Sequence, residues 1–264
     1  MVTMTNWPAH AVVLPGTGSD ARFAADAFSA ALAAVGTSVH AVDPDPTRVV
    51  ASYDEALDAA ARQYGRIIVG GISIGAAVAA AWSTRNTDRV TAVMAALPPW
   101  LGTPDNAPAA LSARLTSHRL TTEGLESTTA AMVSSSPPWL AETLGRSWAA
   151  QWPDLPAALN EAAAYTALDV AQLRGVRTPT AVIGAIDDAV HPYEVAETWH
   201  QEIPRATLST VRLADIGDDP AVLGRLAVAG LQSLLDQPPS CCIAEPDEPR
   251  RGPSAGSGDT GSAC

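Results

Sequence analysis

The strongest chemical signal in this sequence is a serine between two glycines. Residues 71–75 read G-I-S-I-G, directly after the apolar residues 66–70 and at the start of the alanine-rich residues 74–83. A G-x-S-x-G pattern between a strand and a helix is typical of a nucleophilic serine on a strained turn, where glycines remove side chains that would clash. We therefore predict that Ser73 attacks a carbonyl carbon, and that the Ile74 N–H faces the oxyanion that forms.

A second glycine-rich segment, L-P-G-T-G-S-D at residues 14–20, follows the first apolar stretch of the chain. Such a loop can supply the second N–H of an oxyanion hole, here that of Thr17. The segment also fits a loose dinucleotide fingerprint built on Gly16 and Gly18, with Asp43 as the ribose-binding acid. Asp43 lies beyond the usual interval of about 20 residues, and this alternative leaves Ser73 unexplained. An ordinary strand–helix turn is the third interpretation.

These segments must be positioned by a regular scaffold, and the chain alternates short apolar runs with alanine-rich stretches. The apolar runs are continuous, which predicts strands in a sheet that is covered on both faces. We predict strands at 10–14, 38–42, 66–70, 90–97, 180–186 and 207–213, and helices at 21–35, 53–63, 74–83, 193–201 and 220–235. Such an alternation predicts an α/β fold with a mostly parallel sheet.

Two segments depart from this alternation. Residues 98–168 hold four tryptophans and several prolines but no good strand, which predicts a helical insertion over one edge of the sheet. Residues 237–264 are rich in Pro, Gly, Ser and acids, which is typical of a disordered tail. We therefore expect one domain over residues 1–236, with the insertion inside it.

The strand at 180–186 ends in a pair of acids, and residues 187–192 read D-D-A-V-H-P. With this segment, the order of elements over roughly residues 10–235 resembles the α/β-hydrolase family. The shared features are the glycine-rich loop, the G-x-S-x-G turn, the tryptophan-rich insertion and a strand ending in G-x-x-D. The resemblance implies an α/β-hydrolase-like three-layer sandwich with a helical lid.

The resemblance also implies roles for individual residues. Ser73 matches the nucleophile of the family, and Thr17 and Ile74 match the residues whose N–H groups form the oxyanion hole. Asp187 matches the acid of the catalytic triad, and Asp188 takes that role if the loop is shifted by one residue.

The histidine of the triad departs from the family pattern. The family places it in a loop after the last strand, but residues 214–220 read A-D-I-G-D-D-P. A serine needs a neighbouring base to act as a nucleophile. His191, in the loop that holds the two acids, is the best remaining base by its location. The other histidines lie at or within strands (10 and 40), in the insertion (118) and at the end of a helix (200).

Composition excludes several classes of function. The formal net charge of −12 argues against binding to nucleic acid. The basic residues are all arginines, so chemistry that depends on lysine is excluded. No spacing of His, Cys and acids indicates a metal site, and we expect no cofactor. The chain has no predicted signal peptide or membrane span, and we expect a cytoplasmic protein without a membrane partner.

These signals predict a serine hydrolase that acts on a small-molecule carboxylic ester or thioester through Ser73, Asp187 and His191. Tryptophans of the insertion that face the cleft would favour an apolar or aromatic acyl group. Two alternatives stay open. One is a catalytically impaired protein of the same fold that binds a small apolar ligand, and the other is a nucleotide-dependent oxidoreductase that uses the Gly16–Gly18 loop.

Overall fold

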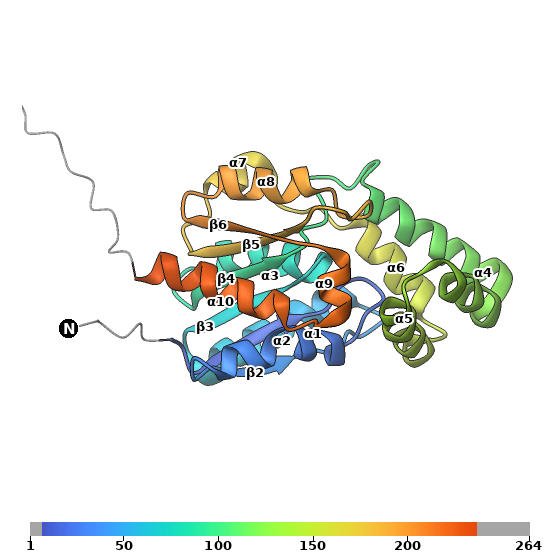
Figure 1. Ribbon diagram of the computed structural model, residues 1–264, viewed down its shortest axis with the longest axis horizontal. Helices are drawn as coiled ribbons and strands as arrows, with labels where there is room; N and C mark the ends of the chain where they lie inside the picture. The colour runs from blue at the N-terminus through green and yellow to red at the C-terminus, as the bar shows by residue number, and fades with distance from the viewer. Residues whose placement is uncertain (1–6, 237–264) are drawn as a thin grey trace, which may run out of the picture.

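A computed structural model describes residues 7–236 of the chain (Figure 1). Its centre is a six-stranded sheet in the order β2-β1-β3-β4-β5-β6, with every neighbouring pair parallel. The strands are β1 (His10–Leu14), β2 (Ser38–Ala41), β3 (Ile67–Ile72), β4 (Val90–Ala96), β5 (Thr180–Ala185) and β6 (Ala206–Val211). The α/β-hydrolase-like fold that the sequence predicts is confirmed, and each predicted strand is present with ends shifted by at most a few residues.

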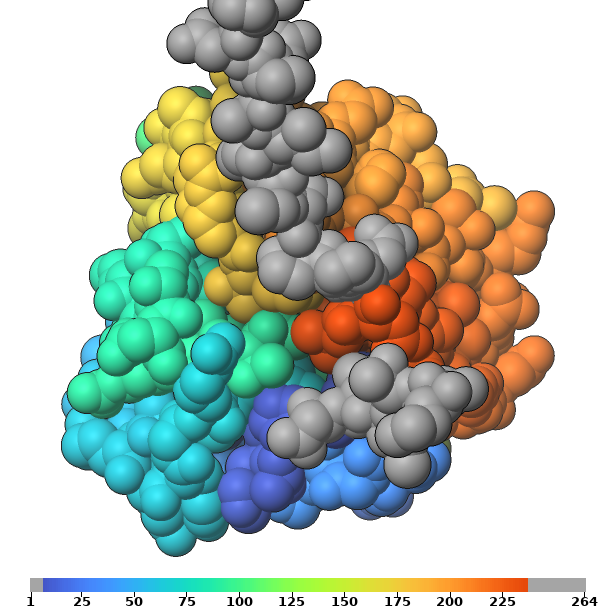
Figure 2. Space-filling model, turned by 90° about the vertical axis from the view of Figure 1, so that its left-hand side faces the viewer, coloured from blue at the N-terminus to red at the C-terminus, as the bar shows by residue number. Residues whose placement is uncertain are grey.

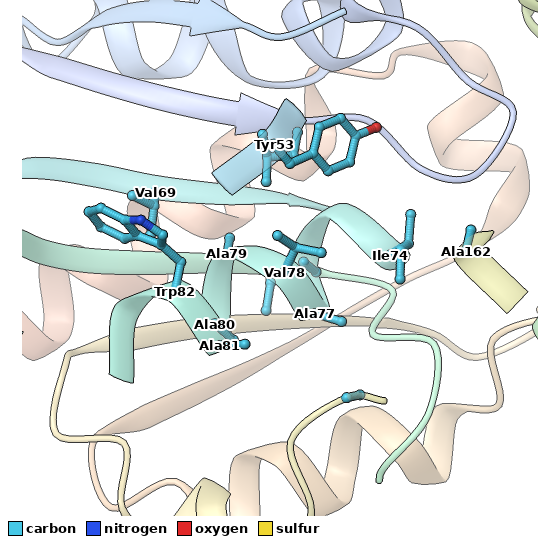
Figure 3. Close-up of a cluster of buried hydrophobic side chains, with 14 of the residues drawn as sticks. Tyr53, Val69, Ile74, Ala77, Val78, Ala79, Ala80, Ala81, Trp82 and Ala162 are labelled. Atoms are coloured by element: carbon cyan, nitrogen blue, oxygen red, sulfur yellow. The ribbon is translucent and has the colours of Figure 1, made fainter. Parts of the chain in front are cut away.

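Helices cover both faces of the sheet, which explains why the central strands are apolar throughout. Helices α1 (Ala21–Ala33) and α10 (Val222–Leu235) pack together on one face. Helices α2 (Val49–Tyr64), α3 (Ile74–Arg85) and α8 (Tyr193–Glu202) lie on the other face. Nearly all of α3 is buried, including its Trp82. Its small alanines let it pack closely against β3 and against α2, which carries Tyr53 (Figure 3).

A helical insertion separates β4 from β5. It contains α4 (Pro108–Ser135), α5 (Pro138–Gln151) and α6 (Leu155–Ala164), and the short α7 (Val170–Arg174) leads back to the sheet. Helix α4 is interrupted at Gly124, whose φ of 81° and ψ of 172° are not helical. Helices α4 and α5 lie at one end of the molecule, beyond the carboxyl ends of the strands (Figure 1). The opposite end of the molecule faces the viewer in Figure 2, so the inserted helices α4 and α5 lie on the far side of that view.

Most of the segment 214–220, for which the sequence predicts a loop after the last strand, is helical. Residues 213–218 form α9 (Leu213–Asp218), which follows β6. Asp215 caps this helix by accepting a hydrogen bond from the Arg212 N–H at 3.0 Å, while Ile216 is buried in the core. The predicted disordered tail at 237–264 lies outside the described residues. Among residues 7–236, no helix is both long enough and apolar enough to span a bilayer.

Candidate active site

Ser73 lies on a strained turn between β3 and α3. Its φ of 53° and ψ of −119° are unusual for a residue with a side chain. The Ser73 N–H donates to the Ala96 carbonyl at 2.9 Å, which holds the turn against β4. A Cβ at Gly75 would overlap the Leu14 carbonyl oxygen and would lie 2.7 Å from that of Pro15. The glycine of the motif is therefore required by the close approach of the loop after β1.

Three side chains form a chain of hydrogen bonds at this turn. The Ser73 Oγ lies 2.9 Å from His191 Nε2, and His191 Nδ1 lies 2.7 Å from Asp188 Oδ2. The Asp188 and His191 side chains are 7% and 16% exposed, so water has little access to this pair. The histidine that sequence reasoning selected by location alone thus reaches the serine.

The structure does not bring Asp187 to His191, in contrast to the assignment made from the family resemblance. Asp187 Oδ1 instead accepts a hydrogen bond from the Leu213 N–H at 2.9 Å, at the start of α9. The pairing of β5 with β6 continues as far as Ile186, whose N–H donates to the Val211 carbonyl at 3.0 Å. This pairing keeps the next residue, Asp187, beside the start of α9. Asp187 therefore points toward α9, and the next residue, Asp188, points toward His191.

Asp188 also folds the loop that carries His191. Its Oδ1 accepts hydrogen bonds from the N–H groups of Val190 at 2.7 Å and His191 at 3.2 Å. Burial would raise the pKa of Asp188, but the hydrogen bonds from His191 and these backbone groups outweigh burial and hold the pKa below its usual value. The Asp188 carboxylate is therefore charged at neutral pH.

The expected oxyanion donors lie beside Ser73. A Cβ added at Gly16 would lie 3.5 Å from Ser73 Cβ, so the Gly16–Thr17 segment borders the serine. Within residues 7–236, the Thr17 N–H donates no hydrogen bond to another protein group. Ile74 is the first residue of α3, where the N–H has no partner within the helix. Both groups are thus available to a ligand oxygen.

The interpretation of the Gly16–Gly18 loop as a dinucleotide site needs Asp43 to bind a ribose, and Asp43 has another partner. Asp43 Oδ1 accepts a hydrogen bond from the Ala21 N–H at 3.1 Å, at the start of α1. In a dinucleotide site this helix end would face the pyrophosphate, and the acid would bind a ribose. Here the acid itself occupies the helix end.

The remaining histidines do not approach Ser73. His10 hydrogen bonds to Ser38 Oγ at 2.8 Å and stacks on Tyr64. His40, His118 and His200 do not line the cavity that borders the serine. In the described part of the chain, no cluster of three or more His, Cys, Asp or Glu residues could hold a metal ion.

A cavity of about 450 Å³ lies between the sheet and the inserted helices. Ser73 and His191 border it together with Thr17 of the loop after β1. Most of the remaining wall is apolar and comes from both hydrophobic cores, with Phe23, Ile72, Leu97, Trp139, Met132, Leu144, Trp148, Leu159, Leu213 and Ile216 among its members. Two tryptophans of the insertion therefore face the cavity, whereas Trp100 donates to the Tyr165 carbonyl at 3.1 Å.

Sequence reasoning did not identify the cavity residues of α4 and α9. Ser112, Thr116 and Arg119 of α4 border the cavity, as do Leu213 and Ile216 of α9. In each helix the spacing of these residues places them on one face. The sequence of α4 has no clear amphipathic pattern, and the sequence predicts a loop where α9 lies. The spacing of Asp188 and His191 was the one available signal that Asp188 contacts this histidine, because Asp commonly accepts hydrogen bonds from the backbone that follows it.

Comparison with known proteins agrees with this architecture. The model of the Alpha/beta hydrolase family matches residues 6–222. No sequence among the curated proteins matches the chain. Among solved structures, an esterase from Rhodococcus sp. is 16% identical with a TM-score of 0.64, and the alignment covers 86% of this chain and 91% of that one.

Two further solved structures are similar to a comparable degree. A hydrolase from Oleispira antarctica is 14% identical with a TM-score of 0.63, covering 87% of this chain and 90% of that one. The enol-lactonase from Burkholderia xenovorans is 19% identical with a TM-score of 0.57, covering 78% and 83%. Likeness at such identities concerns the fold, whereas the family match extends over most of the sequence. The chain belongs to the alpha/beta hydrolase family.

Proposed function

We propose that this protein is a serine hydrolase that cleaves a carboxylic ester or thioester, with Ser73 as nucleophile, His191 as general base and Asp188 as the acid that orients it. The observation that carries the proposal is the 2.9 Å contact between Ser73 Oγ and His191 Nε2. A serine hydroxyl is a weak nucleophile without a base at this distance. The esterases among the structural neighbours make the same reaction class plausible for this fold.

The hydrogen bonds define the proton transfers of the first step. With the Nδ1–H of His191 donated to Asp188, Nε2 is free to accept the proton of Ser73 as its oxygen bonds to the substrate carbonyl carbon. The negative charge moves to the carbonyl oxygen, where the N–H groups of Thr17 and Ile74 stabilise it. The C–O or C–S bond to the leaving group then breaks, and His191 returns the proton to that group.

Water completes the cycle. His191 removes a proton from a water molecule as the water oxygen attacks the acyl–Ser73 ester. Collapse of the second tetrahedral intermediate releases a carboxylic acid and restores the Ser73 hydroxyl with the proton held by His191. The alternative of a catalytically impaired protein depends on the missing histidine after the last strand, and the position of His191 beside Ser73 favours the active hydrolase over it.

A serine-directed fluorophosphonate tests the proposal directly. We expect the wild-type protein to be labelled at Ser73, and Ser73→Ala to abolish both labelling and the hydrolysis of ester substrates. Ser83→Ala is a matched control, because Ser83 lies in α3, which follows Ser73, but is buried and donates to the Ala80 carbonyl. Folded wild-type protein that is neither labelled nor active on esters and thioesters would contradict the proposal.

A further inference from the structure

Among the polar residues of the cavity wall that the proposed reaction does not use, three form a stripe on one helix. Ser112, Thr116 and Arg119 lie on one face of α4, because they are spaced four and three residues apart, and all three border the cavity. Helix α4 lies at the end of the molecule that the carboxyl ends of the strands face (Figure 1). The stripe therefore belongs to the lid side of the substrate cavity.

Arg119 is the only Lys or Arg side chain that borders this cavity in the described part of the chain. Its side chain is 38% exposed, and its Nε and one terminal nitrogen each lie 3.2 Å from Glu123, one turn further along α4. Glu123 does not border the cavity. Arg119 thus borders the cavity, and the carboxylate that pairs with its guanidinium lies outside the cavity, on a surface helix where such a pair is weak.

The two hydroxyls of the stripe are also available to a ligand. Some hydroxyls of α4 bond back to the helix, as Thr121 does to the Ser117 carbonyl and Thr122 to that of His118, both at 2.9 Å. Among the described residues, Ser112 and Thr116 have no hydrogen-bond partner for their side chains. Two hydroxyl donors and a guanidinium on one helix face form a donor set that suits a carboxylate.

We propose that this stripe binds a carboxylate of the substrate, so that the substrate is an ester or thioester that carries a second, anionic group away from the scissile bond. Arg119 is then a specificity-determining residue, and Glu123 competes with the substrate for it. A basic side chain is needed here because the chain as a whole has a net charge of −12 and repels anions. The inference rests on the proposed function for the identity of the scissile bond, but not for the binding of the anion.

Binding measurements test the stripe without turnover. Dicarboxylic acids with four to eight carbons are compared with their monoamides, which have the same shape but lack one charge. We expect the wild-type protein to bind at least one diacid about fivefold or more tightly than its monoamide, by calorimetry at low salt. The preference should fall as the ionic strength rises.

Variants assign the preference to Arg119. Arg119→Gln should remove it, whereas Glu123→Gln should increase it, because the competing carboxylate is gone. Arg22→Gln is the matched control, since Arg22 and Asp26 form an ion pair of the same spacing on α1, at 3.9 Å and outside the cavity. Circular dichroism checks that each variant is folded.

Two results would overturn the inference: equal binding of every diacid and its monoamide to the wild-type protein, or an unchanged preference in Arg119→Gln. Both can be read from a protein that fluorophosphonate does not label, so a failure of the proposed function is distinguishable from a failure of this inference. If the protein is active, the monoethyl esters of the same diacids should be hydrolysed faster than the corresponding ester amides, and Arg119→Gln should remove this difference.

Discussion

The segments after the last two strands of the sheet lie side by side and have different roles. The loop after β5 holds Asp188 and His191, which form hydrogen bonds that end at Ser73. The segment after β6, where the family places its histidine, is the helix α9 without any histidine. Leu213 and Ile216 of this helix border the cavity instead. In this chain the imidazole that reaches the serine therefore comes from the loop after β5 and not from the segment after the last strand.

Exchange of the base should have the largest effect. Because His191 is the only imidazole that reaches Ser73, His191→Ala should lower kcat/KM for ester hydrolysis by at least about 10²-fold and up to about 10⁴-fold. Asp218→Asn in α9 should leave the rate unchanged, because Asp218 is exposed and does not border the cavity. Steady-state kinetics on one ester measures both. An unaltered rate in His191→Ala would remove the loop after β5 from the mechanism.

The two neighbouring acids of that loop offer a sharper test. Asp188→Asn should lower kcat by about 10²-fold, because the amide cannot stabilise a positive imidazole as a carboxylate does. Asp187→Asn should keep kcat within about twofold, since Asp187 binds only the Leu213 N–H. The same kinetic assay compares the two variants, and a larger loss in Asp187→Asn would reverse the assignment of the acid.

A change in the packing of α9 should have the smallest of the expected effects. It should alter the stability of the protein, because α9 contributes apolar contacts and no charged group to the cavity wall. A Cβ at Gly217 would overlap the indole ring of Trp139, so Gly217→Ala should lower the free energy of unfolding by about 1–3 kcal/mol. Gly145→Ala in α5 is the control, because the nearest atom to its new Cβ is Thr129 Cγ2 at 4.0 Å. In a helix this change should stabilise the protein by about 0.5–1 kcal/mol.

Urea unfolding measures the free energies of both glycine variants. If Gly217→Ala proved as stable as the wild-type protein, α9 would not be packed against the lid helix α5 through Trp139.

The scaffold could be predicted from the sequence because each central strand is apolar on both faces and the flanking helices α1, α2 and α3 are rich in alanine. The turn at Ser73 could be predicted for a similar reason, since its glycines are required by contacts that any such turn makes. The choice between Asp187 and Asp188 could not, because it depends on where the pairing of β5 with β6 stops. Helix α9 escaped prediction because it is short and contains Gly217.

The loop after β5 has one more consequence for how the protein would lose its activity. Asp188 and His191 belong to one connection, and their neighbours Ile186 and Val190 are 47% and 39% exposed. A local opening of this connection would detach both residues from Ser73 at once while the sheet stays intact. Inactivation by a mild denaturant would then be a single step that comes before global unfolding and reverses when the denaturant is diluted.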